Sequence, residues 1–341
     1  MSGPFGSSQW MYKSSEYEID NSLRFDDAVG HYLELTPGTA GNRRTYSFAT
    51  WVKRGALNVG FQRLFSAESP QDYIGITNAN RICVNHSSDN TLTGSEVSHF
   101  FRDSSAWFHI LVAVDTTQAT ASNRVHIYIN GVELSDYGNG EGAADPVYPQ
   151  ENTETGVNTT TRHRIGAEAN TSTAGNFFDG YMADTYFIDG TAKAPTDFGK
   201  FGDYGEFKPI AYSGSFGDNG FYLDYKSSGV GTAGTTTIGA DRSGNANHFT
   251  STAIAATDQM PDTPSNNFCT MNPIDVQTAD KLIEGNLQLE PGNGRARGTI
   301  AVTTGKWYFE VLFEAQASST IDVGISGVVH KISDDIGNEF V

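Results

Sequence analysis

Residues 107–115, WFHILVAVD, and residues 125–134, VHIYINGVEL, decide the fold class. The second stretch alternates apolar and polar side chains as far as Asn130-Gly131, a pair that tolerates the positive φ of a tight hairpin turn. The first stretch is apolar on both sides of its alternation, which is typical of a central strand covered on both faces. Together they predict a sheet in which the hairpin lies beside the 107–115 strand.

The rest of the N-terminal half repeats this pattern. The chain has 341 residues with 37 Gly, 21 Phe and 15 Tyr, a composition that favours strands and turns. Clusters of Gly, Asn, Ser, Pro and Asp separate ten short apolar stretches, at 22–25, 32–35, 45–54, 62–67, 73–76, 81–85, 107–115, 124–134, 162–167 and 180–189. Such spacing predicts an all-β, two-sheet sandwich.

Charge and hydropathy exclude two classes of partner. Acidic residues outnumber basic ones 40 to 22, for a formal net charge of −18. Phosphate-backbone binding needs a net cationic face, so we expect no nucleic acid. Because the N-terminus lacks a basic stretch followed by an apolar one, and no apolar run approaches bilayer length, we expect neither a secretion signal nor membrane insertion.

The chain divides into four parts. Residues 1–20 carry large apolar side chains in no clear period, which predicts an arm that docks through Phe5, Trp10, Met11 and Tyr12. Residues 21–225 hold the sandwich, and residues 226–273 are expected to be an irregular connector with a proline-rich end. Strand patterns resume over 274–341, with a hairpin at Gly285-Asn286 and further strands at 298–302, 305–315 and 319–326.

Three sequence motifs in the predicted sandwich resemble those of a known family. They are Trp107-Phe-His-Ile110, Ile127-Tyr-Ile-Asn-Gly131 and Phe178-Asp-Gly-Tyr-Met-Ala-Asp184. Their order and composition are similar to those of concanavalin A-like jelly rolls of the laminin G or pentraxin type. The resemblance implies a jelly-roll sandwich for residues 21–225.

Two further resemblances concern the C-terminal half. Residues 241–248, DRSGNANH, and 262–268, DTPSNNF, look like stretches of structural proteins of marine tailed phages, where such a sandwich precedes a SPRY-like domain. Residues 305–315, GKWYFEVLFEA, with 322–325, DVGI, are similar to the opening strands of a SPRY domain. Since a SPRY sandwich continues well beyond such strands, residues 274–341 are expected to be the start of a truncated, incomplete second β-sandwich.

Concanavalin A-like sandwiches include glycoside hydrolases of family 16, so we tested the sequence for their carboxylate pair. Those enzymes need a nucleophile and an acid/base on one strand face, in an E-x-D-x-E or E-x-D-x-x-E pattern. Residues 16–20, EYEID, supply Glu18 and Asp20, but the final acid would fall on Ser22 or Leu23. With no Gly-x-Ser-x-Gly elbow either, the sequence predicts no catalytic residue and a solvated strand edge at 16–20.

The candidate binding residues follow weaker sequence patterns than the predicted strands do. The laminin G and pentraxin resemblance implies calcium, for which Asp184 and Asp136 are the candidate ligands; Asp184 as a hydrogen-bonding strand-end residue is the alternative. For sugar stacking, Tyr128, Tyr137, Tyr148 and Tyr73 lie near predicted strand ends or loops, although each could equally pack in the core or its rim.

The resemblances and the missing catalytic pair favour a non-enzymatic virion structural protein of a tailed phage. We expect a tail-fibre or host-recognition protein, assembled in the host cytoplasm and exposed on the particle, that contacts other virion proteins through its N-terminal arm and a host glycan through its sandwich. A homo-oligomer is expected, a trimer if it is a fibre. The alternatives are a capsid decoration or head fibre protein, a soluble calcium-dependent lectin and, last, a glycoside hydrolase.

Overall fold

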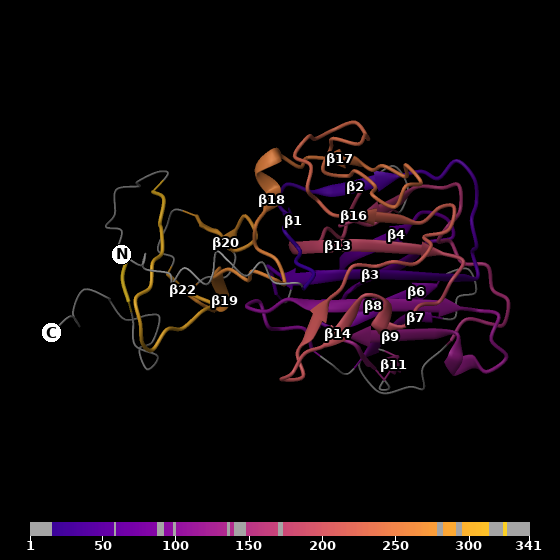
Figure 1. Ribbon diagram of the computed structural model, residues 1–341, viewed down its shortest axis with the longest axis horizontal. Coiled ribbons are helices and arrows are strands. Elements are labelled where there is room, and N and C mark those ends of the chain that lie inside the picture. The colour runs from indigo at the N-terminus through magenta and orange to yellow at the C-terminus, as the bar shows by residue number, and fades with distance from the viewer. Residues whose placement is uncertain are drawn as a thin grey trace.

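The computed structural model describes residues 16–57, 59–86, 92–97, 100–134, 137–139, 148–169, 173–277, 282–290, 295–313 and 323–325, with backbone alone for 92–97 and 137–139. Within these ranges the chain is all-β, as the sequence predicts. Two antiparallel sheets of eight strands each face one another as a sandwich (Figure 1).

The strand order of each sheet defines the topology. The first sheet runs through β10 (Val132–Glu133), β9 (Val125–Ile129), β8 (Phe108–Asp115), β3 (Thr45–Arg54), β13 (Gly180–Asp189), β1 (Ser22–Phe25) and β18 (Gln259–Met260), with β16 (Phe221–Leu223) also paired to β13. The second runs through β11 (Tyr137–Asn139), β7 (Leu92–Val97), β6 (Ile82–His86), β5 (Asp72–Ile76), β4 (Gln62–Ala67), β12 (His163–Ile165), β2 (Tyr32–Leu35) and β17 (Thr250–Thr252).

Shorter elements lie outside these two sheets. Three two-stranded pairs are β14 (Gly199–Phe201) with β15 (Phe207–Pro209), β19 (Met271–Val276) with β22 (Ala296–Gly298), and β20 (Leu282–Ile283) with β21 (Gln288–Leu289). Single turns of 3₁₀ helix occur at η3 (Ala121–Asn123), η4 (Pro195–Asp197) and η5 (Ala256–Asp258). In the described residues no helix is long and apolar enough to span a membrane.

The two stretches that decide the fold behave as predicted. All residues of β8 except the last are buried, because β3 and β9 flank it and both of its faces are covered. β9 alternates buried and half-buried side chains. Asn130 and Gly131 adopt φ of 48° and 78°, as a hairpin of this twist requires.

Aromatic stacking joins the two sheets. Phe65 from β4 stacks on Phe48 from β3, with ring centroids 4.9 Å apart and planes 7° from parallel. Phe187 and Phe221 of the first sheet also contact the Phe65 ring. Since each ring is at most 3% exposed, this cluster contributes apolar burial at the centre of the sandwich.

Two short strands within the expected connector at 226–273 belong to the sheets of the sandwich. β17 adds to the edge of the second sheet beside β2, and β18 adds to the first beside β1. The buried Lys53 ammonium fixes the segment that follows, donating to the Asp262 carboxylate at 2.8 Å, the Asn267 side chain at 2.8 Å and the Phe268 carbonyl at 2.7 Å. These short strands consist of two or three residues among turn-forming residues, without apolar alternation, so the sequence does not predict them.

Beyond the connector, β19, β20 and β22 lie at one end of the sandwich (Figure 1). The predicted hairpin at Gly285-Asn286 is present, closed by positive φ at Glu284, Gly285 and Asn286. The predicted strand at 305–315 does not form over its described part, 305–313, where no other described segment pairs with it and Trp307 and Tyr308 are exposed. The SPRY-like domain therefore stays a prediction.

Candidate functional site

One pocket opens at the rim of the sandwich where three chain segments meet. It encloses about 200 Å³ and is lined by the β1–β2 turn, the segment that leads into β4 and the segment that leads into β13; the lining residues are Asp27, Val59, Gly60, Phe61, Gln62, Asn176 and Phe177. The backbone N–H of Arg63 donates to the Asn176 carbonyl at 2.9 Å. This bond fixes two walls of the pocket to each other.

An aromatic and cationic group continues from the pocket along β4 and β5. Phe61 at the pocket is 41% exposed, whereas Arg63 is only 5% exposed. The Arg63 guanidinium carbon lies 3.5 Å from the Tyr73 ring centroid and 5.4 Å from that of Phe61. Such stacking holds a planar cation between two ring faces, and it places Tyr73, one of the predicted sugar-stacking residues, beside the pocket.

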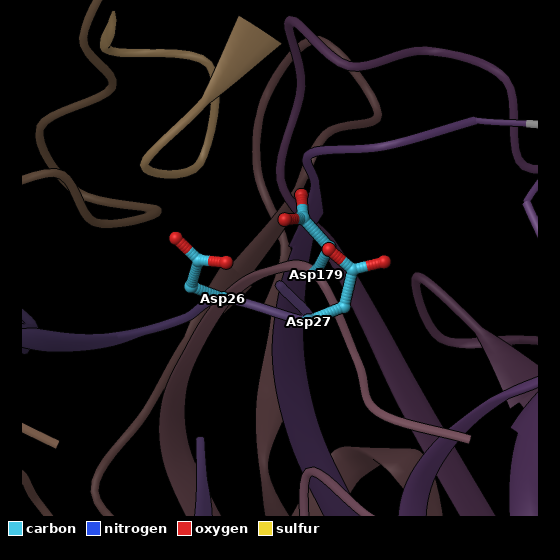
Figure 2. A group of neighbouring side chains, drawn as sticks. All are labelled: Asp26, Asp27 and Asp179. Carbon is cyan, nitrogen blue, oxygen red and sulfur yellow. The ribbon is translucent and has the colours of Figure 1, made fainter. Parts of the chain in front are cut away.

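Three carboxylates gather at this rim, and one of them, Asp27, lines the pocket. Asp26 and Asp27 follow β1, and Asp179 precedes β13, the strand that pairs with β1 (Figure 2). One oxygen from each lies within 4.8 Å of the others. Because antiparallel neighbours bring the end of one strand to the start of the other, β1 and β13 place these acids together.

Backbone groups orient two of the three carboxylates. The Ala56 N–H donates to the Asp179 carboxylate at 2.6 Å, and a Cβ on the preceding Gly55 would lie 1.8 Å from the same carboxylate oxygen. Glycine is therefore required at position 55 for Asp179 to occupy this place. The Ala28 N–H donates to the Asp26 carboxylate at 2.8 Å, forming a local turn.

Burial and mutual repulsion make these acids hard to ionise together. Burial, followed by the charge of Asp27, raises the pKa of Asp179 to about 7, although the Ala56 N–H and the Arg54 charge act in the opposite direction. Burial and the Asp26 charge also raise the pKa of Asp27. Such a group favours either a shared proton or a bound cation.

Gln62 is a second unusual polar group at this rim. Its side chain is 1% exposed, and neither its amide nitrogen nor its amide oxygen has a hydrogen-bond partner in the described structure. A buried unpaired amide costs free energy unless a water or an ion satisfies it. Gln62 and Asp27 line the same pocket.

Asp184, the predicted calcium ligand, lies away from this rim within β13. At a bulge with φ of 45°, its buried carboxylate accepts hydrogen bonds from the hydroxyls of Tyr17, Tyr222 and Tyr186, at 2.7, 2.8 and 3.2 Å. Burial raises its pKa to about 6, while the hydroxyls lower it. These contacts favour the alternative from the sequence, a hydrogen-bonding role, and they attach the chain at Tyr17 to the first sheet.

The other predicted site residues are dispersed. Tyr128 is half-buried on the first sheet, where its ring stacks on His126 with centroids 6.2 Å apart, and Tyr148 is half-buried against the core. Tyr137 belongs to β11, whose backbone alone is described. Asp136 and the arm residues Phe5, Trp10, Met11 and Tyr12 lie outside the described residues. None of these predictions is tested.

The acids proposed from the enzyme pattern lie at the surface. Glu16 faces Lys200 and Lys208 at 3.6 and 3.7 Å, and Asp20 faces Lys226 at 2.9 Å. They belong to exposed ion pairs and are solvated, as predicted, but residues 16–20 form no strand, since β1 begins at Ser22. Sequence reasoning missed Asp26, Asp27 and Gln62, and it noted Asp179 only as part of a strand mark. One sequence signal was available for the acids. Asp26 and Asp27 directly follow a predicted strand, and Asp179 directly precedes another.

Comparisons with known proteins give structural likenesses alone. No known protein family matches the sequence. No curated protein matches it either.

Three solved structures illustrate the likenesses. A putative carbohydrate-binding protein from Bacteroides ovatus is 14% identical at a TM-score of 0.45, over 70% of this chain and 60% of that one. A heptameric SAP-like pentraxin from Limulus polyphemus is 14% identical at 0.37, over 52% and 78%. The CBM40 domain of a Ruminococcus gnavus sialidase is 12% identical at 0.29, over 50% and 86%. The chain spans about 60% of the length of the first, and likenesses this low carry no argument about function.

Proposed function

We propose that this chain is a non-enzymatic carbohydrate-binding protein carried on the surface of a tailed-phage virion, with the rim pocket as its glycan site. The observation that carries the proposal is the composition of that pocket. It brings the exposed ring of Phe61 together with three polar residues, Asp27, Gln62 and Asn176, around one hollow. Rings that stack on sugar faces and polar groups that bond to hydroxyls are the elements of a small-molecule site.

The size of the pocket limits its ligand. At about 200 Å³ it is smaller than the roughly 300–1,000 Å³ of sites for drug-sized molecules. It therefore suits one terminal sugar residue, with the rest of the glycan extending over Phe61 towards Tyr73. One sugar gives weak binding, so a useful affinity for a host surface depends on repeated copies.

The virion location rests on the resemblance of residues 241–248 and 262–268 to phage structural proteins. In the structure, the 262–268 stretch is bonded to Lys53 of the central strand β3. This contact supports a single structural unit that contains the sandwich and the phage-like stretch. A capsid decoration or head fibre protein would have the same features as a tail fibre.

A glycan array followed by titration tests the binding proposal. Phe61→Ala should weaken binding of any glycan that the wild type retains by about three- to tenfold, the value of one aromatic contact. The matched control is Phe201→Ala, which removes an exposed ring of the β14–β15 hairpin and should leave binding unchanged. No glycan bound by the wild type, or equal losses in both variants, would contradict the proposal.

The location is tested separately on purified particles. Antibodies against the chain should label the outside of the virion in electron micrographs, and the chain should stay with the particles through a density gradient. Recovery in the soluble fraction of the lysate alone would refute the virion role but leave the glycan site standing.

A hydrolytic role for the rim carboxylates has one observation in its favour. The raised pKa of Asp179, near Asp27, is a property of an acid/base pair, and retaining glycosidases hold two such groups about 5–5.5 Å apart. Asp179 is nearly fully buried, however, so a substrate does not reach it easily. Release of reducing sugar from a bound glycan, lost in Asp179→Asn, would replace the binding proposal with an enzymatic one.

A further inference from the structure

We propose that Arg63 recognises an anion beside the rim pocket, and that the glycan bound there is acidic, with a carboxylate-bearing sugar lying over β4 and β5. The inference rests on the proposed glycan site and adds the chemical class of its ligand. It follows from a buried cation that no acid of the described chain neutralises.

Arg63 is a buried charge without a counterion. Its side chain is only 5% exposed. Within the described ranges it forms no ion pair with an Asp or Glu, and its Nε and Nη1 nitrogens have no hydrogen-bond partner. A buried charge is costly unless something pairs with it, and a carboxylate is the partner whose geometry matches a guanidinium.

Glu168 is the acid whose charge reaches this group, and its carboxylate is already bonded elsewhere. Burial raises the pKa of Tyr73, and the Glu168 charge adds to this effect while the Arg63 charge opposes it. The Glu168 carboxylate accepts hydrogen bonds from the side-chain amides of Gln71 and Asn176, the latter at 2.6 Å. It forms no ion pair with Arg63, so the guanidinium remains uncompensated.

The neighbouring strand holds the Arg63 side chain in place. Arg63 of β4 pairs in register with Gly75 of β5, where a Cβ would lie 3.4 Å from the Arg63 Cδ. Any larger side chain at Gly75 would take the space of the Arg63 stem. The guanidinium carbon then lies 3.5 Å from the Tyr73 ring centroid. The cation is therefore positioned by the fold and is not a free surface side chain.

Stacking on Tyr73 selects among anions. A carboxylate bonds in the plane of the guanidinium, so it can lie beside the ring as the guanidinium does. Sulfate and phosphate are tetrahedral, and they carry oxygens out of this plane, where the ring obstructs them. The geometry therefore favours a sugar acid over a sulfated sugar or a phosphate backbone.

Asp27 and Phe61 determine where the acid lies along the glycan. Asp27 lines the pocket, and its carboxylate repels an acidic sugar inside it. Phe61 also lines the pocket, and its ring centroid lies 5.4 Å from the Arg63 guanidinium carbon. Because this ring is 41% exposed, it has room to turn and open the guanidinium to a ligand. A neutral sugar thus occupies the pocket, and the acid belongs to the next residue.

A second group of arginines and an aromatic ring lies at the same end of the second sheet. The Phe100 ring is 44% exposed, and the guanidinium carbons of Arg81 and Arg102 lie 4.8 and 4.4 Å from its centroid. Arg81 directly precedes β6, which starts at the end of the sheet where β4 starts. In a chain with a net charge of −18, these cations let a longer acidic glycan continue from Arg63 across the sheet.

Binding of the full chain to immobilised alginate, polygalacturonate and hyaluronate, each beside its carboxyl-reduced form, tests the inference. Reduction turns each acid into a neutral alcohol and keeps the sugar backbone. We expect the wild type to bind at least one acidic polymer, and its reduced form about tenfold or more weakly, the value of one charge-assisted hydrogen bond.

Three variants assign this preference to Arg63. Arg63→Met should lower the affinity for the acidic polymer to that for the reduced one, while Arg63→Lys should keep part of the preference because it keeps the charge. The matched control, Arg44→Gln, removes an equal charge at the far end of β3 and should bind like the wild type. If circular dichroism shows that Arg63→Met does not fold, Arg63→Gln is judged by the same criterion.

Several results would overturn the inference. They are equal affinities for acidic and reduced polymers, an acid preference that survives Arg63→Met, or tighter binding to dextran sulfate or an oligonucleotide than to any sugar acid. Retention of neutral glycans that depends on Phe61, without an acid preference, would refute the acidic ligand and leave the glycan site standing. Binding to no glycan at all would refute both.

Discussion

The buried carboxylate of Asp184 should make the stability of the sandwich depend on pH in a defined window. Burial raises its pKa from the ordinary 3.8 to about 6, even though three tyrosine hydroxyls donate to it. Between these two values the folded chain keeps a proton that the unfolded chain has released. The free energy of unfolding therefore falls as the pH rises, by about 1.4 kcal/mol per pH unit and about 3 kcal/mol in all.

Asp184→Asn isolates this contribution. Asparagine does not titrate, it keeps an oxygen that accepts from the tyrosines, and it tolerates the positive φ of 45° at this position. Urea unfolding in EDTA should show the variant gaining about 2–2.5 kcal/mol relative to the wild type between pH 4 and pH 7. Tyr17→Phe should act in the opposite direction, because losing a donor raises the pKa of Asp184 further and widens the window. A difference between Asp184→Asn and wild type that stays constant from pH 4 to pH 7 would refute the reasoning.

Three further substitutions test the packing. Lys53→Met should destabilise the fold by about 3–5 kcal/mol in urea unfolding, because the buried Asp262 carboxylate loses its paired cation; adding Asp262→Leu should recover part of the loss, and no recovery would contradict the account. Gly131→Ala should cost more than about 1 kcal/mol, since φ is 78° and the new methyl group meets an aromatic ring. The control is Gly38→Ala, whose added carbon meets nothing within 4 Å, and equal thermal midpoints for these two variants would count against the argument. Phe65→Ala should cost about 3–5 kcal/mol by the same unfolding assay, and a loss below 1 kcal/mol would mean that its ring does not join the sheets.

The sequence predicts the main strands well because their signal is local. The alternation in 125–129, the apolar run in 107–115 and the turn at Asn130-Gly131 each follow from neighbouring residues, and the structure confirms all three. The expected strand at 180–189 has the same bounds in the structure. Strands of two or three residues, such as β17 and β18, carry no such signal, because their place depends on a free sheet edge.

The rim site could not be predicted in the same way. Asp26 and Asp179 are ordinary acids at loop ends, and they become a cluster only because β1 pairs with β13. The sequence pointed to Asp184 instead, which resembles a family ligand but is enclosed by tyrosine hydroxyls. Gln62 carries no sequence signal, since its meaning lies in having no partner in the described structure.

The pairing of β3 with β13 also has a consequence for synthesis on the ribosome. β3 ends at Arg54 and its partner ends at Asp189, so the centre of the first sheet cannot close until more than a hundred further residues have been translated after β3. Contacts of such high sequence separation slow folding and leave strand edges open to other chains in the meantime. Nascent chains on neighbouring ribosomes of one mRNA should therefore be prone to exchange β13. Slower translation between β3 and β13 should increase aggregation more than slower translation after Asp189.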